Sequence, residues 1–98
     1  MSKLTTEKVQ EKLKSLAGWK LVNGEIVREA SFKDFMSAMD FVNQVAGSAE
    51  AAGHHPDIDI RYNKVRLALV SHDAGGLTSR DFELATVIED MLAGRPGR

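Results

Sequence analysis

The chain has 98 residues, of which 43% are hydrophobic and 28% are charged, a composition typical of one globular domain with a packed core rather than of a disordered or fibrous chain. Thirteen Lys and Arg against fourteen Asp and Glu give a net charge of −1, without a basic cluster, which argues against direct binding to nucleic acid. The absence of cysteine excludes disulfides, zinc–thiolate sites and thiol nucleophiles.

The N-terminal segment, MSKLTTEKVQEKL, is polar and lacks the apolar centre of a signal peptide. No apolar run approaches the length of a membrane span, so we expect a cytoplasmic protein with no membrane partner. The same segment predicts a first helix, which Thr5 or Thr6 caps and which ends just before Gly18. Its apolar positions at helical spacing are Val9, Leu13 and Leu16.

The following segment, WKLVNGEIVREASF, predicts a β-hairpin. Asn23-Gly24 is the dipeptide preferred in two-residue turns that need a positive φ at both positions. With these residues as the turn, Leu21 lies opposite Ile26. The two apolar side chains then share one face of the hairpin.

A long amphipathic helix is predicted from about 34 to 52, where apolar residues recur at three- and four-residue steps. Either Asp34 or Ser31 can cap its beginning. Gly53 follows at the position where a left-handed residue ends a helix.

A last helix is predicted from about 79 to 93. Thr78 and Asp81 are spaced as in a capping box at its beginning. Two hairpins separated by a helix, with further helices at both ends, indicate the order α-β-β-α-β-β-α. We therefore expect a single α+β domain spanning 1–98, with a four-stranded antiparallel sheet and helices on one face. The uncovered face or an open edge strand needs protection, which predicts a homo-oligomer.

The stretch AGHHPDIDIRYNKVRLALVSHD contains all three histidines and the second hairpin. If Asn63-Lys64 is its two-residue turn, all apolar pairs fall on one face, and a slip by one residue would misalign them. Lys64 is a poor residue for that turn, so a longer loop with a bulge is an alternative. Extended to the open end of the hairpin, the two-residue turn places His55 opposite His72, so the histidines are expected to converge.

A pair of histidines in one pocket can act as general acid and general base near neutral pH. Glu50 lies one helical turn before His54 and can orient a ring or contact a substrate. The competing interpretation of a lone histidine is a surface or core side chain, and convergence favours a site instead. A metal site is not expected, because adjacent histidines seldom bind one ion and no HxH or HExxH spacing is present.

Three segments resemble the pterin-4a-carbinolamine dehydratases: EAAGHHP at 50–56, YNKV at 62–65, and SHDAGGLT at 71–78 followed by Asp81. The resemblance implies three helices on one side of the sheet and assembly as a homodimer or a dimer of dimers. It also implies dehydration of 4a-hydroxytetrahydropterin, with the small-molecule pterin as substrate and no cofactor, in the recycling of tetrahydrobiopterin. Gly53 and Ala74 depart from residues frequent in the family, and neither position carries a proton-transfer group.

The resemblance also implies roles for individual residues. His54 and His72 would transfer protons, and His55 would hold the pterin. Other residues would line or brace the pocket, namely Glu50, Ser71, Asp73 and Asp81. The family also resembles a dimerisation cofactor of a homeodomain transcription factor, so a non-enzymatic interaction module is the alternative function.

Overall fold

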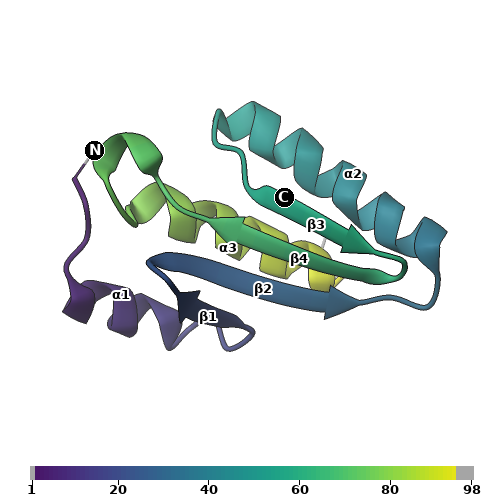
Figure 1. Cartoon of the computed structure of the whole chain (residues 1–98), viewed down its shortest axis with the longest axis horizontal. Coiled ribbons are helices and arrows are strands. Elements are labelled where there is room, and N and C mark those ends of the chain that lie inside the picture. The colour runs from purple at the N-terminus through teal and green to yellow at the C-terminus, as the bar shows by residue number, and fades with distance from the viewer. Residues whose placement is uncertain (1, 95–98) are drawn as a thin grey trace.

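The computed structural model describes residues 2–94, in which the helices and strands follow the predicted order α-β-β-α-β-β-α (Figure 1). The helices are α1 (Thr6–Leu13), α2 (Phe35–Ala52) and α3 (Ser79–Leu92). The strands are β1 (Trp19–Val22), β2 (Glu25–Ser31), β3 (Asp57–Arg61) and β4 (Lys64–Leu69). A short 3₁₀ helix, η1 (His72–Ala74), follows β4. The predicted α+β fold is confirmed.

The sheet is antiparallel with strand order β1-β2-β4-β3, so β1 and β3 are its edge strands. Figure 1 shows β2 and β4 in the middle of the molecule, α3 behind them, and α1 and α2 to either side. One face of the sheet packs with all three helices in a single core. Its most buried members include Ile26, Val45, Leu67, Leu69, Ala85 and Ile88. The other face carries exposed charged side chains such as Lys20, Glu29 and Arg66.

The first helix is shorter than predicted. Thr5 caps it through a hydrogen bond that Thr5 Oγ1 accepts from the Lys8 amide at 3.2 Å, but the helix ends at Leu13 rather than just before Gly18. Leu16 is still buried, because the turn that follows the helix directs it into the core. The Trp19 amide donates to the Leu16 carbonyl at 2.9 Å, so this turn begins the first strand.

The second helix has the predicted termini. Asp34 is its N-cap and accepts a 2.8 Å hydrogen bond from the Ser37 amide, which lowers the pKa of that carboxyl. Gly53 ends the helix with φ +64°, a left-handed conformation that glycine adopts at little cost. The next amide, of His54, donates to the Ala49 carbonyl at 3.1 Å. The backbone of His54 is therefore fixed by the end of α2.

The first hairpin has the predicted register, with Leu21 opposite Ile26, but the register predicted for the second hairpin is wrong by two residues. Arg61 pairs with Lys64, so the turn is Tyr62-Asn63 instead of Asn63-Lys64. Tyr62 adopts φ +53°. Asn63 fastens this turn to the residue after β2, because its side-chain amide donates to the Phe32 carbonyl at 2.7 Å and its own carbonyl accepts from the Phe32 amide at 2.9 Å.

The corrected register changes what lies at the open end of the hairpin. Strand β3 begins at Asp57, opposite Ala68. If the observed register is extended by three positions beyond Asp57, His54 lies opposite Ser71. The predicted pairing of His55 with His72 is therefore wrong.

Candidate active site

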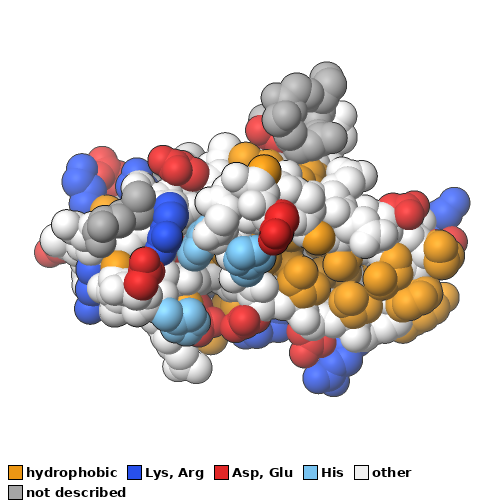
Figure 2. Space-filling view, turned by 90° about the horizontal axis from the view of Figure 1, so that it is seen from above, with side chains coloured by type: hydrophobic (Ala, Val, Ile, Leu, Met, Phe, Trp, Pro, Cys, Tyr) orange, Lys and Arg blue, Asp and Glu red, His pale blue; other side chains and the backbone are white. Residues whose placement is uncertain are grey.

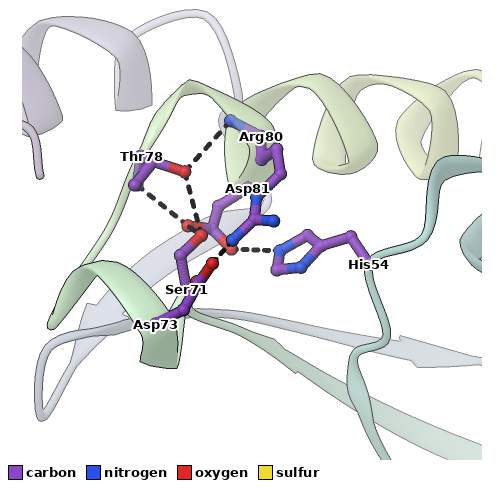
Figure 3. Close-up of polar contacts among 6 residues, drawn as sticks. All are labelled: His54, Ser71, Asp73, Thr78, Arg80 and Asp81. Atoms are coloured by element: carbon purple, nitrogen blue, oxygen red, sulfur yellow. Dashed lines mark hydrogen bonds and ion pairs between the residues drawn. The ribbon is translucent and has the colours of Figure 1, made fainter. Parts of the chain in front are cut away.

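A buried carboxylate lies at the centre of the candidate site. Asp81, in the first turn of α3, is completely buried, and its Oδ1 lies 2.5 Å from Nε2 of His54 (Figure 3). The two residues are 27 positions apart in sequence, and the beginning of α3 meets the end of α2 at this point. An imidazole and a carboxylate in such contact form an acid–base pair in which the carboxylate orients the ring.

A hydroxyl group and a backbone amide complete the hydrogen bonds of Asp81. Its Oδ2 accepts hydrogen bonds of 2.9 Å from Ser71 Oγ and from the Thr78 amide. Because the Ser71 hydroxyl gives its single proton to Asp81, the 2.9 Å contact between Ser71 and Thr78 has Thr78 Oγ1 as the donor. Both oxygens of the buried carboxylate are thus hydrogen-bonded, as a buried charge requires.

The capping box of α3 places Asp81 at this point. Thr78 is the N-cap, and the Asp81 side chain accepts from the Thr78 amide as the sequence pattern predicts. The pattern could not show that the other oxygen of the same carboxylate holds a histidine. Asp81 therefore both caps α3 and positions His54.

The loop after β4 is closed on itself. Ser71 and Gly76 exchange two backbone hydrogen bonds, at 3.1 and 3.2 Å, across the turn of η1. Gly75 has φ +75°, which permits the tight return. Ser71 is consequently held beneath Asp81 while His72, the next residue, is exposed.

The ring of His54 has one nitrogen in the interior and one at the surface. Nε2 faces Asp81, and the side chain is 8% exposed. Nδ1 makes no hydrogen bond within the described residues and is not among their buried unpartnered atoms, so it reaches the surface. A carboxylate at Nε2 favours the tautomer with the proton on that nitrogen, which leaves the Nδ1 lone pair free to accept a proton.

His55 and Glu50 form a second, exposed pair. His55 Nε2 lies 2.7 Å from Glu50 Oε1, and the two side chains are 64% and 82% exposed. Successive residues of an extended segment point in different directions, which explains why the neighbouring histidines have different partners. The ring of His55 is oriented by its partner and remains accessible to a ligand.

Asp73 is exposed and pairs with Arg80, whose Nη2 donates to Asp73 Oδ1 at 2.7 Å. This hydrogen bond lowers the pKa of the Asp73 carboxyl. Nε of Arg80 is buried without a hydrogen-bond partner. The pair connects η1 to the beginning of α3 at the edge of the site (Figure 3).

His72 has a different neighbourhood. It makes no hydrogen bond or ion pair with His54 or His55 within residues 2–94, and it lines a surface cavity of about 460 Å³ beside α1. The histidine side chains nevertheless gather toward one end of the molecule, beside an apolar area (Figure 2).

The structure thus joins three of the predicted site residues directly, namely His54, Ser71 and Asp81. It places Glu50 with His55, Asp73 with Arg80, and His72 in the adjoining cavity. Sequence reasoning missed the Thr78 hydroxyl and Arg80 as members of the site. The capping-box pattern was the available signal for Thr78, whereas only the fold brings Arg80 to Asp73.

Among the described residues, no group of three or more His, Cys, Asp or Glu side chains has an arrangement that could hold a metal ion. In residues 2–94, no helix has the length and apolar character needed to cross a membrane.

Comparison with known proteins gives consistent matches over almost the whole chain. The family model described as pterin 4 alpha carbinolamine dehydratase matches residues 2–91. Relatives from Acidobacterium capsulatum and Chloroflexus aurantiacus, both provisionally named pterin-4-alpha-carbinolamine dehydratases, are 63% and 53% identical. Each alignment covers 94% of this chain, and 100% and 99% of the respective relative.

Among solved structures, a Brucella melitensis protein described as a transcriptional coactivator/pterin dehydratase superposes with a TM-score of 0.88. It is 35% identical, and the alignment covers 92% of this chain and 98% of that one.

Proposed function

Since the chain belongs to the pterin 4 alpha carbinolamine dehydratase family, we propose that it removes water from 4a-hydroxytetrahydropterin to give quinonoid dihydropterin. The reaction would serve the recycling of tetrahydrobiopterin after aromatic hydroxylation. The pterin is the substrate, and the proposed chemistry uses no further cofactor. The observation that carries the proposal is the pairing of His54 with the buried carboxylate of Asp81.

The reaction requires two proton transfers. The hydroxyl at C4a leaves as water after it receives a proton, the C4a–O bond breaks, and a ring nitrogen of the pterin loses a proton. One side chain that can accept and one that can donate near neutral pH suffice for both steps. Histidines meet this requirement without a metal ion or a nucleophile.

His54 is the stronger of the two candidates for proton transfer. When the Nε2 proton of His54 is directed to Asp81, Nδ1 carries a lone pair at the surface. This lone pair can take the proton from the pterin ring. The positive charge that then develops on the imidazole is stabilised by the carboxylate at 2.5 Å. Ser71 and Thr78 keep that carboxylate in place.

His72 is proposed as the second proton-transfer residue. It is exposed on a closed loop directly after Ser71, which holds the other oxygen of Asp81. His55, oriented by Glu50, would hold the pterin, and Asp73 with Arg80 would brace the edge of the pocket.

The test is a stopped-flow dehydration assay on purified protein with 4a-hydroxytetrahydropterin generated in the mixing chamber. We expect His54→Ala and His72→Ala each to lower kcat by about 10²- to 10⁴-fold. His55→Ala, as the matched neighbour, should raise KM with a smaller effect on kcat. Wild-type rates in folded His54→Ala and His72→Ala variants would show that the assignment is wrong.

A second candidate function is an interaction module, because the Brucella melitensis neighbour is also described as a transcriptional coactivator. Self-association fits either function. The sheet has two edge strands, and exposed apolar side chains lie on both of them or at their ends, namely Leu21, Val22, Ile58 and Tyr62. A homodimer or homotetramer would cover such surfaces. If the assay shows no catalysis above the spontaneous rate, the interaction module becomes the better interpretation.

A further inference from the structure

His72 differs from the other two histidines in what holds its side chain. Nε2 of His54 contacts the Asp81 carboxylate, and Nε2 of His55 contacts Glu50. In the part of the chain that the structure describes, the His72 side chain makes no hydrogen bond or ion pair. The position of the His72 ring is therefore set by the backbone of η1, which carries it.

The residues on either side of His72 are both held by the first turn of α3. Ser71 Oγ donates to Asp81 Oδ2 at 2.9 Å, and Asp73 Oδ1 accepts from Arg80 Nη2 at 2.7 Å. Arg80 and Asp81 are consecutive in α3, so two adjacent residues of one helix hold the two neighbours of His72 (Figure 3). The backbone of His72 is thus fastened to α3 on both sides.

The position of Arg80 is fixed by the beginning of α3. Its amide donates at 3.3 Å to the hydroxyl group that caps the helix. Its side chain is 29% exposed and runs from the helix toward Asp73 (Figure 3). The next residue, Asp81, contacts His54. A short connection of defined geometry therefore relates the backbone of His72 to the ring of His54.

Stability does not account for the pair of Arg80 and Asp73. The Asp73 side chain is 73% exposed, and an ion pair in such a position contributes little to the free energy of unfolding. Nε of Arg80 is buried without a hydrogen-bond partner among the described residues, which is unfavourable. The placement of the loop that the pair fastens is the better explanation of its geometry.

We propose that Arg80 is a positioning residue, which holds η1 through Asp73 so that His72 stays at a fixed distance from His54. The inference rests on the proposed dehydratase function and adds to it the residue that maintains the geometry of the two proton-transfer groups. Arg80 neither touches the pterin nor transfers a proton in this proposal. Its effect on the rate comes from geometry, because a displacement of about 1 Å at a reacting group can cost about 10²-fold.

The experiment measures stopped-flow dehydration of 4a-hydroxytetrahydropterin by the wild type, Arg80→Met and Asp73→Ala. Arg80→Met keeps the length of the side chain and removes its donors, whereas Asp73→Ala breaks the same pair from the loop. Arg61→Met is the matched control, because Arg61 forms a pair of the same kind with Asp59 on β3, outside the site. The ¹⁵N order parameter of the His72 amide in the same variants reports the mobility of η1 without an activity assay.

We expect Arg80→Met and Asp73→Ala each to lower kcat about tenfold while KM stays almost unchanged. The double variant should lose no more than Arg80→Met alone, since both substitutions remove the same interaction. The order parameter of the His72 amide should fall from about 0.85 to about 0.6 in both single variants. Arg61→Met should change neither kcat nor the order parameter.

A second comparison separates positioning from a general effect on the fold. In a His72→Ala background, Arg80→Met should not lower kcat further, because no ring remains to be positioned. A substitution that only loosens the fold would lower kcat by the same factor in both backgrounds. Arg80→Lys keeps the charge and a donor, so it should restore kcat to a value between those of Arg80→Met and the wild type.

Three results would overturn the inference. They are a wild-type kcat in folded Arg80→Met and Asp73→Ala, an equal loss from Arg80→Met with and without His72, and an unchanged order parameter of the His72 amide. If the wild type does not dehydrate the substrate above its spontaneous rate, the proposed function itself fails. The role of Arg80 in catalysis then fails as well, even where the order parameters show that Arg80 holds η1.

Discussion

Replacement of Asp81 by Asn should invert the hydrogen-bonding roles of the His54 ring. Oδ2 of Asp81 accepts from two donors, Ser71 Oγ and the Thr78 amide, each at 2.9 Å. In Asp81→Asn, the side-chain carbonyl oxygen must take the place of Oδ2 to accept from both Ser71 Oγ and the Thr78 amide. The amide NH₂ is then directed at Nε2 of His54. The ring must accept there and carry its proton on Nδ1, so the surface nitrogen becomes a donor and loses its capacity to accept a proton.

The expected cost in activity is much larger than the cost in stability. Because the capping interaction with Thr78 remains, we expect a loss of about 1–2 kcal/mol in the free energy of unfolding, from the weaker contact with His54. The kcat for dehydration should fall by about 10²- to 10⁴-fold, the contribution of a positioned acid–base group. The assays are stopped-flow dehydration, denaturant unfolding, and ¹⁵N NMR of the His54 ring to identify the tautomer.

Asp34→Asn is the matched control, because Asp34 also caps a helix through its side chain but lies outside the site. It should leave both kcat and the His54 tautomer unchanged. A folded Asp81→Asn variant with wild-type kcat would refute the proposed role of the pair. A variant that loses activity while the Nε2 proton remains in place would refute the tautomer argument.

Two further predictions concern stability and assembly. The pKa of Glu89 is lowered by hydrogen bonds from Arg28, and also from the Trp19 indole, so its contribution to folding is present above the ordinary glutamate pKa and is lost as pH falls through the lowered value. Glu89→Gln should therefore lower the free energy of unfolding by about 1 kcal/mol at pH 7 and by almost nothing near pH 2, as measured by denaturant unfolding. Glu29→Gln, exposed on the same sheet, is the control and should show no such pH dependence. An equal loss for Glu89→Gln at both pH values would contradict the assignment. Light scattering coupled to size-exclusion chromatography should give the mass of a dimer or tetramer, and a monomer mass at micromolar concentration would remove the self-association proposal.

Local sequence signals predicted most of the fold because they act over a few residues. Asn23-Gly24 set the first turn, Asp34 and Gly53 set the ends of α2, and the capping box set the beginning of α3. The helical spacing of Val9, Leu13 and Leu16 predicts a longer first helix than the one observed, because it counts Leu16 as a helical residue. Its burial comes from a turn that leads into Trp19, a tertiary requirement that helical spacing does not express.

The candidate site was only partly predictable. The resemblance assigned Asp81 to the pocket without a partner, and a capping aspartate gives no local sign that its second oxygen is used elsewhere. The contact with His54 exists because α2 and α3 pack together and bring residues 27 positions apart within 2.5 Å. Burial of Asp81 follows from the same packing and makes hydrogen bonds from the Ser71 hydroxyl and the Thr78 amide necessary.

The error in the second hairpin has a specific origin. Side chains alternate with a period of two, so a slip by one residue moves the apolar set to the wrong face, whereas a slip by two leaves it on the same face. Hydrophobic pattern alone could not distinguish the predicted turn from the observed one. The hydrogen bonds between Asn63 and Phe32 fasten the observed turn, and they form only when β2 lies beside β4. That shift places His54, rather than Pro56, across from Ser71, and Asp81 can then bond both His54 and Ser71. The resemblance assigns proton transfer to His54 from sequence motifs alone. The observed register supports the same proposal independently, because it depends on contacts between strands that the hairpin sequence does not reveal.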